Sequence, residues 1–237
     1  MLKAIQKALS LILFFLPENM VRAIGFETFS YFGRSTTKTL RTRVGKNYVN
    51  LGCGPNLVTG WINVDFFAVK GVDYAADLRF PLKITSETVD GIFTEHTLEH
   101  LAYPDADRLL GECYRIMKKE TAIRIVVPDV SLFITNYSSN NTSWFEKWEE
   151  LYFRNSKSEE RSKRKLNTPL EALSFVTQEY GHQSSWDFQT LSHYLRKNGF
   201  TEITRCDFMK GTHPPLLIDQ DEEDRKFISI YIEARKA

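Results

Sequence analysis

Short apolar runs alternate with amphipathic segments from residue 48 onward. Five of these runs are rich in Val, Ile and aromatic residues, as is typical of parallel strands that are buried on both faces. The predicted strands are Tyr48–Leu51, Trp61–Val64, Val72–Ala75, Val89–Thr94 and Ala122–Val127. Strands that alternate with helical segments indicate an α/β layer structure.

The clearest helix lies between the last two of these strands. Apolar residues recur there at three-and-four spacing after Asp105, which we expect to cap the helix. They are Ala106, Leu109, Leu110, Cys113, Ile116 and Met117. A right-handed crossover would place this helix against one face of the sheet.

The rhythm breaks after the fifth strand. Residues 136–168 combine a Ser/Asn-rich turn, an aromatic helical segment and a charged run, and we interpret them as an insertion. Regularity returns with a helix through Leu191 and Leu195 that stops at Gly199-Phe200, and with an alternating strand over Phe227–Glu233. The predicted organisation is an arm over residues 1–46 and one domain over residues 47–237.

Composition is that of an ordinary globular protein, with 42% hydrophobic and 26% charged residues. The three cysteines, Cys53, Cys113 and Cys206, are widely spaced, so neither a disulfide framework nor a CxxC metal knuckle is available. A reducing, cytoplasmic compartment is the simpler interpretation.

The N-terminal arm differs chemically from the rest of the chain. Residues 1–46 hold eight Lys or Arg against two Glu, a net charge of +6, so that the chain's total of +1 leaves −5 for the remainder. The apolar run Ala8–Leu16 has nine residues, whereas a bilayer-spanning helix needs about 20. No small-residue cleavage site follows it, which disfavours a secretory signal.

Two interpretations of this arm stay open. Its aromatic and basic residues could bind peripherally to a membrane with anionic headgroups, on its inner face. Alternatively, the arm could pack on the core or on a second copy in a homo-oligomer. A nucleic-acid partner is not expected, because the basic excess lies in an apolar arm and in no identifiable reading motif.

The most informative chemistry follows the first predicted strand. Gly52-Cys53-Gly54 forms a glycine turn, and Asp65 ends the next strand eleven residues after Gly54. Glycines let the backbone approach a ligand closely, and a carboxylate on the adjacent strand can accept both hydroxyls of a ribose. A dinucleotide site is disfavoured, because Leu57 stands at the third glycine position and Asp65 comes early.

Several ordered motifs carry a resemblance to a known family. They are Asn50-Leu51-Gly52-Cys53-Gly54, Trp61-Ile62-Asn63-Val64-Asp65, Ala76-Asp77-Leu78, Glu95-His96-Thr97-Leu98-Glu99-His100-Leu101 and Val126-Val127-Pro128-Asp129. From about residue 47 to its end, the chain resembles class I S-adenosylmethionine-dependent methyltransferases. It is most similar to the type 11-like group that is often found in bacterial surface-polysaccharide clusters.

The resemblance implies a Rossmann-like three-layer sandwich whose seven-stranded, mostly parallel sheet has an antiparallel last strand. It implies S-adenosylmethionine as the cofactor, over the carboxyl ends of the strands. Gly52, Cys53 and Gly54 would line its methionine part, Asp65 would bind the ribose, and Asp77 with Leu78 would hold the adenine. Glu95 and His96 would lie where strand four opens toward the methyl group.

The chain departs from the family pattern at two places. Asn50 stands where many relatives carry an acid, and an amide offers no charge to the cationic part of the cofactor. Lys118-Lys119-Glu120-Thr121 replaces the expected Lys-Pro-Gly-Gly turn before strand five.

The resemblance also implies in-line transfer of a methyl group to an acceptor oxygen, here a sugar of a surface glycan or glycolipid. A sugar hydroxyl is a poor nucleophile and would profit from a general base, for which His96, His182 and Asp129 are the candidates. Aromatic residues could stack on sugar faces or belong to the core. They are Trp144, Trp148, Tyr152, Tyr180 and Trp186.

The segment His96-Thr97-Leu98-Glu99-His100 matches H-x-x-E-H, the inverted zinc-peptidase signature. Its context after strand four of a glycine-turn sheet argues against a peptidase, and the sequence marks no third ligand, so we predict no metal. Three hypotheses remain: a methyltransferase, a non-catalytic methyltransferase-like scaffold at a membrane, and a zinc metallopeptidase.

Overall fold

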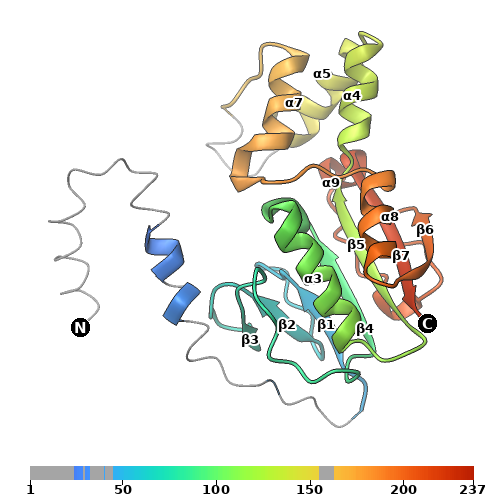
Figure 1. The fold of residues 1–237 in the computed structure, drawn as a ribbon. Helices are drawn as coiled ribbons and strands as arrows, with labels where there is room; N and C mark the ends of the chain where they lie inside the picture. Colours follow the sequence, from blue (N-terminus) through green and yellow to red (C-terminus); the bar gives the residue numbers. More distant parts are fainter. Residues whose placement is uncertain (1–23, 29, 33–39, 41–44, 155–162) are drawn as a thin grey trace, which may run out of the picture.

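A computed structural model describes residues 24–28, 30–32, 40, 45–154 and 163–237. Its centre is a seven-stranded sheet in the order β3-β2-β1-β4-β5-β7-β6 (Figure 1). The strands are β1 (Tyr48–Leu51), β2 (Ile62–Asp65), β3 (Tyr74–Ala75), β4 (Gly91–Glu95), β5 (Thr121–Pro128), β6 (Thr201–Cys206) and β7 (Ser229–Lys236). The first five strands run parallel, and β7 runs antiparallel to both β5 and β6. The predicted Rossmann-like fold is confirmed.

The order of the strands fixes where a ligand can bind. The chain moves from β1 outward to β2 and β3, and then returns to place β4 and β5 on the other side of β1. The carboxyl ends of β1 and β4 therefore form a topological switch point, where open α/β sheets bind their ligands. The glycine turn begins at this point, directly after Leu51.

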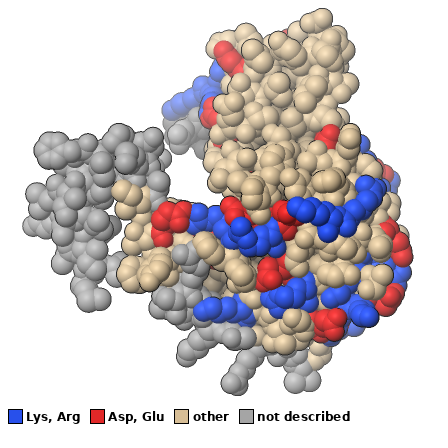
Figure 2. Space-filling model, viewed as in Figure 1, with Lys and Arg blue, Asp and Glu red and all other residues tan. Residues whose placement is uncertain are grey.

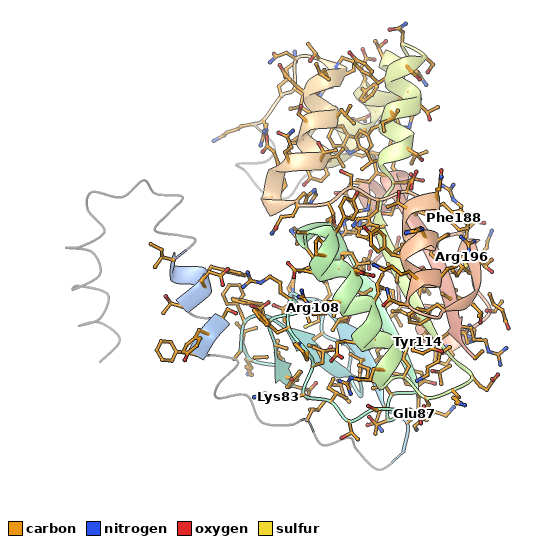
Figure 3. The ribbon with its side chains drawn as sticks, in the orientation of Figure 1. Lys83, Glu87, Arg108, Tyr114, Phe188 and Arg196 are labelled. Atoms are coloured by element: carbon orange, nitrogen blue, oxygen red, sulfur yellow. The ribbon has the colours of Figure 1, made fainter. Side chains whose placement is uncertain are left out.

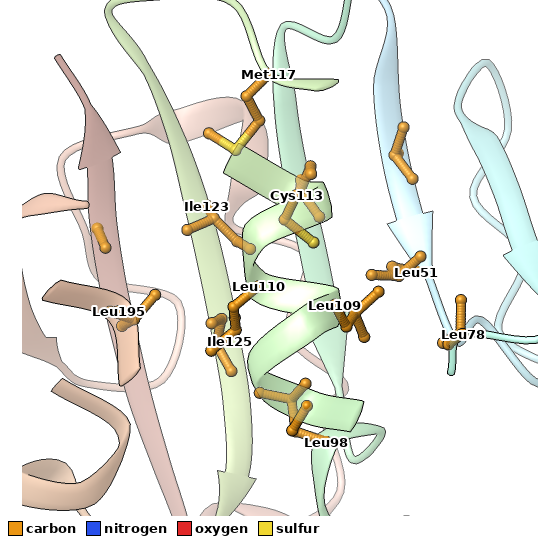
Figure 4. Packing of buried hydrophobic residues seen from close by; sticks show 14 of the residues in the cluster. Leu51, Leu78, Leu98, Leu109, Leu110, Cys113, Met117, Ile123, Ile125 and Leu195 are labelled. Carbon is orange, nitrogen blue, oxygen red and sulfur yellow. The ribbon is translucent and has the colours of Figure 1, made fainter. Parts of the chain in front are cut away.

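Helix α3 (Tyr103–Ile116) covers one face of the sheet, as its apolar spacing predicts. Its buried Leu109, Leu110 and Cys113 face Leu51 of β1 and Ile125 of β5 (Figure 4). The capping prediction is wrong, however. The residue before the helix is Ala102, with Pro104 at the start, and Asp105 lies inside the first turn. Proline is suited to this position because it has no N–H to satisfy.

Helix α8 (Phe188–Lys197) lies on the same face as α3 and ends at Gly199, whose φ of +91° suits a glycine. Partly buried Tyr114 of α3 and Phe188 of α8 pack against the core (Figure 3). The opposite face is covered by Phe208 and Ile218, which pack on Phe93 of β4, Val126 of β5 and Tyr231 of β7.

A fully buried arginine fastens the segment over this second face. Arg124 in β5 pairs with Asp219 at 2.5 Å and with Glu233 at 3.2 Å, and it also donates to the carbonyl groups of Asp207 and Lys210. These four partners satisfy the guanidinium in a place that water does not reach. The remaining short elements are η4 (Pro214–Leu216) and α9 (Glu223–Ile228).

The helices of residues 130–178 form a separate layer beyond the carboxyl ends of β5 (Figure 1). They are α4 (Val130–Ser138), α5 (Thr142–Glu149), the π-helical turn η2 (Glu150–Arg154) and α7 (Pro169–Gln178). Their buried aromatic residues form a core of their own, centred on Phe133, Trp148 and Phe175. On the face seen in Figure 2, charged side chains gather over the sheet domain, and few lie on these helices.

The last strand and the N-terminal arm can be compared with the predictions from sequence. Phe227 and Ile228 belong to α9, so the last strand begins at Ser229. The described part of the N-terminal arm is helical over residues 24–28 and 30–32, while the apolar run Ala8–Leu16 lies outside the described residues. No helix among the described residues is long and apolar enough to cross a membrane.

Candidate functional site

The glycine turn is held in shape by the strands on either side of it. Gly52 has a φ of +70°, and a Cβ there would lie 2.1 Å from Oγ1 of Thr97, so this position requires glycine. The N–H groups of Gly52 and Cys53 donate to the carbonyl of Val64, at 2.9 and 3.0 Å. Buried Asn50 holds the residues before and after the turn together, because its Nδ2 donates to the carbonyl of Asn56 at 2.8 Å. The unusual amide is therefore a structural part of the turn.

A pocket of about 550 Å³ opens beside this turn. Six of the predicted site residues line it, and they come from the ends of β1, β2 and β4 and from the loop after β3. They are Gly52, Gly54, Asp65, Asp77, Leu78 and His96. The sheet topology brings them together because the carboxyl ends of parallel strands share one edge.

Gly54 and Asp65 define the floor of this pocket. The N–H of Gly54 donates to Oδ2 of Asp65 at 2.7 Å, and a Cβ on Gly54 would point into open space. Backbone is thus exposed to a ligand where any side chain would intrude, next to a carboxylate. This arrangement fits the methionine and ribose parts of S-adenosylmethionine, which need close backbone approach and a hydroxyl acceptor.

The described part of the N-terminal arm forms one wall of the pocket. Phe26 stacks on Phe66 with ring centroids 4.3 Å apart, and Glu27 pairs with Arg79 at 2.5 Å. At Phe26 and Glu27 the arm therefore packs on the core of its own chain, which is one of the two interpretations left open by the sequence. Arg108 of α3, labelled in Figure 3, supports the wall by donating to the carbonyl of Arg79.

Asp77 lines the same wall, and its carboxylate is engaged by protein. Oδ2 accepts from Nη2 of Arg79 at 2.7 Å and from the hydroxyl of Ser30, and Oδ1 accepts from Nε and the N–H of Arg79 at 3.0 Å. Although burial opposes the charge, the hydrogen bonds from Arg79 and Ser30 lower the pKa of this carboxyl. Asp77 therefore shapes the wall by fixing Arg79.

His96 stands at the carboxyl end of β4 in the left-handed region, with a φ of +49°. Its Nε2 lies 2.9 Å from the hydroxyl of Ser229, and its Nδ1 lies 3.3 Å from Oε1 of Glu99. Burial, and after it the charge of Arg225, holds the pKa of His96 well below its usual value, so the imidazole is neutral at pH 7. The predicted base thus has the required protonation state and lies at the pocket.

Glu95 and Cys53 face a second, smaller space of about 270 Å³ on the other side of Gly52. Oε2 of Glu95 accepts from the N–H of Gln220 at 3.2 Å, and Oε1 lies 3.7 Å from Arg225. Burial raises the pKa of Glu95 to about 7, and it also raises the pKa of Cys53 to about 11. The Cys53 thiol is accordingly unreactive.

Asp129 and His182, the other two candidate bases, do not line this pocket. Asp129 is fully buried, caps α4 by accepting from the N–H of Ser131 at 3.1 Å, and pairs with Arg205 at 2.9 Å. His182 lies next to His100, one of the lining residues, with ring centroids 4.9 Å apart. Asp129 therefore has a structural role, and His182 lies one residue removed from the pocket.

The predicted sugar-stacking residues separate clearly in the structure. Trp148 and Trp186 are fully buried, while Trp144 and Tyr152 pack against the core of the helical layer. Tyr180 lines the pocket with 53% of its surface exposed. It belongs to η3 (Glu179–Gly181) and has a φ of +57°, rare for a tyrosine.

The H-x-x-E-H segment does not form the helix that an inverted zinc peptidase needs. His96 lies in a turn before the short η1 (Leu98–His100), so the two histidines are not related by a helical turn. Among the described residues, a different group could hold a metal ion, namely Glu99, His100 and His182. The third member comes from a segment that the sequence spacing does not mark.

A family model described as a methyltransferase domain matches residues 26–204. The chain belongs to this methyltransferase family. The match begins inside the predicted arm, at the residue that stacks on Phe66. Together with the sheet topology, it confirms that S-adenosylmethionine is the cofactor.

Solved structures of methyltransferases resemble this one at low sequence identity. A SAM-dependent methyltransferase of Thermotoga maritima, described as a possible histamine N-methyltransferase, is 17% identical, with 90% of this chain and 89% of that chain covered and a TM-score of 0.46. A SAM-dependent methyltransferase of Archaeoglobus fulgidus is 16% identical, with 91% and 94% covered and a TM-score of 0.45.

Phosphoethanolamine N-methyltransferase 2 of Haemonchus contortus, in complex with S-adenosyl-L-methionine, is 11% identical. The alignment covers 84% of this chain and 50% of that chain, with a TM-score of 0.44. No curated protein matches the sequence.

Several residues of the methyltransferase pocket were not predicted from sequence. Phe66, Arg79 and Gln183 line it beside the predicted residues, and so does Phe26. Phe66 and Arg79 each directly follow a predicted site residue, Asp65 and Leu78, so their positions in the sequence offered a signal. Phe26 offered none, because 21 residues separate it from the first strand at Tyr48, and only the fold brings it to the pocket.

Proposed function

We propose that this methyltransferase methylates a hydroxyl oxygen on a sugar of a surface glycan or glycolipid. The observation that carries the proposal is the chemistry of the pocket lining, which includes neutral His96 together with Tyr180 and Gln183. An imidazole can take a proton from a hydroxyl, and an exposed aromatic ring and an amide in the same pocket suit a sugar face with its hydroxyl groups.

Other residues of the pocket would hold and orient the methyl donor. S-adenosylmethionine supplies an electrophilic methyl group on a sulfonium sulfur. Gly52 and Gly54 expose backbone to its methionine part, Asp65 offers its carboxylate to the ribose, and the Phe26–Phe66 pair covers the adenine side. Because the leaving sulfur needs no acid, the protein contributes mainly alignment and exclusion of water.

His96 has the position of a general base in this scheme. The hydroxyl of Ser229 fixes its Nε2 side, and burial keeps its ring neutral. A strongly lowered pKa makes it a weak base, so its contribution would be largest when the acceptor hydroxyl is itself acidified.

The test is transfer of a radiolabelled methyl group from S-adenosylmethionine to a glycan or glycolipid extract. As the matched control, a portion of the same extract is first oxidised with periodate, which destroys the vicinal diols of its sugars. We expect label only in the untreated extract, and we expect it to resist alkali, because methyl ethers are stable where methyl esters hydrolyse. Label released by alkali would point to a carboxyl acceptor instead. Binding of S-adenosylmethionine without transfer to any extract would favour the non-catalytic scaffold.

A further inference from the structure

Three metal-ligating side chains meet beside the methyltransferase pocket. One ligand atom from each of Glu99, His100 and His182 lies within 4.8 Å of the other two. Glu99 and His100 belong to η1, and His182 follows η3, 82 residues later. His100 also lines the pocket, so the group borders the place where an acceptor would bind.

The two segments that carry these residues are joined by hydrogen bonds to the backbone carbonyls of η1. The N–H of Gln183 donates to the carbonyl of Glu99 at 2.7 Å, and its side-chain amide donates to the carbonyl of His100 at 3.0 Å. The hydroxyl of Ser184 donates to the carbonyl of Leu98 at 3.1 Å. The relative placement of the two segments that carry the three residues is therefore set by the fold.

Glu99 is a buried carboxyl group without compensation. Its side chain is 3% exposed, and neither oxygen accepts a hydrogen bond from the described residues. Nδ1 of His96 is 3.3 Å from Oε1, but the contact lacks hydrogen-bond alignment. Buried carboxyl groups are normally hydrogen-bonded, paired or bound to a metal, so this one lacks a partner of positive charge.

The histidines are oriented as metal ligands usually are. Nδ1 of His182 lies 2.7 Å from the carbonyl of Val176, which requires a proton on Nδ1 and leaves the lone pair of Nε2 free. The ring of His182 in turn lies edge-on to that of His100, with centroids 4.9 Å apart. Metal-ligating histidines characteristically donate their second ring nitrogen to a carbonyl in this way.

We propose that Glu99, His100 and His182 bind one divalent transition-metal ion. Two imidazoles and one carboxylate suit Mn²⁺, Fe²⁺, Co²⁺ or Zn²⁺ better than Mg²⁺ or Ca²⁺, which prefer oxygen ligands alone. Ligand atoms at roughly 2.0–2.2 Å from one ion lie at most about 4.4 Å apart, so closure from 4.8 Å needs only a small side-chain adjustment. Ionised Glu99 would then neutralise part of the ion's charge.

The ion would also have a role in methyl transfer to a hydroxyl, and this role rests on the proposed function. A three-ligand site keeps open positions, and an acceptor hydroxyl bound there would be acidified and held beside the pocket. Binding of the ion itself depends on no assumption about the acceptor.

The test is equilibrium dialysis of chelator-treated full-length protein against Mn²⁺ and, separately, Zn²⁺, without cofactor or acceptor, with metal counted by elemental analysis. We expect about one ion per chain, and roughly tenfold or greater weakening in Glu99→Gln and His182→Ala. Matched controls are Glu146→Gln and His193→Ala, whose side chains are exposed outside the group, and we expect them to bind like the parent.

Folding and function are separated by two further measurements. Circular dichroism and calorimetric binding of S-adenosylmethionine report whether each variant is folded, and His182→Gln replaces His182→Ala if the latter is not. Absence of stoichiometric metal, or equal binding in the folded Glu99 and His182 variants, would overturn the metal site. Metal binding without methylation of any glycan would instead overturn the proposed function and leave the site standing.

Discussion

The N–H of Gly54 donates a 2.7 Å hydrogen bond to Oδ2 of Asp65. This bond joins the turn after β1 to the end of β2, so the carboxylate fixes the backbone of the turn. Oδ1 of Asp65 meanwhile accepts a longer bond, at 3.3 Å, from the N–H of Phe67. Asp65 thus positions the turn, and we expect it also to bind the ribose of the cofactor.

Replacing Asp65 with Ala removes the ribose acceptor and loosens the turn at once. We expect S-adenosylmethionine to bind roughly 10- to 100-fold more weakly, the loss of one or two hydrogen bonds to a charged group. Isothermal calorimetry measures this, with Asp207→Ala as the control, since its side chain is 76% exposed on the opposite face. Unchanged affinity in Asp65→Ala would remove Asp65 from the site.

The two glycines of the turn should respond differently to alanine. At Gly52 the new Cβ would lie 2.1 Å from Oγ1 of Thr97, so we expect a loss of about 2–4 kcal/mol in unfolding free energy from overpacking and positive φ. At Gly54 the Cβ meets open space, so Gly54→Ala should lose less stability but weaken cofactor binding by filling the pocket. Denaturant titration and calorimetry on both variants distinguish the two effects.

The wall formed by the N-terminal arm gives a third prediction. Phe26→Ala removes the ring that stacks on Phe66, and aromatic pairs contribute about 0.5–1.5 kcal/mol. We expect S-adenosylmethionine to bind roughly 2- to 10-fold more weakly by calorimetry. Tyr31→Ala, in the same arm but 63% exposed and outside the pocket, should bind like the parent. Tighter binding in Phe26→Ala would mean that Phe26 competes with the cofactor.

Arg124 gives a prediction about stability alone. Arg124→Met leaves the carboxylates of Asp219 and Glu233 buried without their cation, which should cost about 3–5 kcal/mol of unfolding free energy in guanidinium titrations. Arg154→Met removes an ion pair whose arginine side chain is 62% exposed, so the expected loss is below about 1 kcal/mol. Equal losses in the two variants would contradict a structural role for the buried network.

Glu95 makes stability depend on pH. Burial raises its pKa from 4.5 to about 7 in the folded protein, so between these values the folded state keeps a proton that the unfolded state releases. The unfolding free energy should therefore fall as pH rises through this window, by on the order of 3 kcal/mol in total from this residue. Denaturant titrations from pH 4.5 to 8 should show a shallower decline in Glu95→Gln, while exposed Glu150→Gln should follow the parent.

The periodicity of the sequence predicted most of the sheet. The predicted runs at Tyr48–Leu51 and Ala122–Val127 correspond to β1 and β5, because short runs rich in Val and Ile are typical of strands buried on both faces of a sheet. Errors occurred where local signals compete. Asp105 is an acceptable cap by residue type, but Pro104 sets the start of α3 one turn earlier.

Parts of the site that follow one another along the chain were accessible to sequence reasoning. The glycine turn and Asp65 are separated by a single strand, so the parallel register brings them together with little freedom. The wall around Phe26 and the aromatic environment of Trp148 were not accessible, because an apolar residue can pack equally well against lipid, a partner or its own core.

By itself, the sequence determined the α/β fold and the glycine turn, since these depend on residue types at short and regular spacing, while the cofactor followed from the family that the ordered motifs resemble. Only the tertiary structure decided which candidate bases reach the pocket, which of the candidate aromatic residues lines it, and that His182 meets Glu99. These depend on contacts between segments more than 80 residues apart, and their geometry is set by how whole elements pack, which no local pattern encodes.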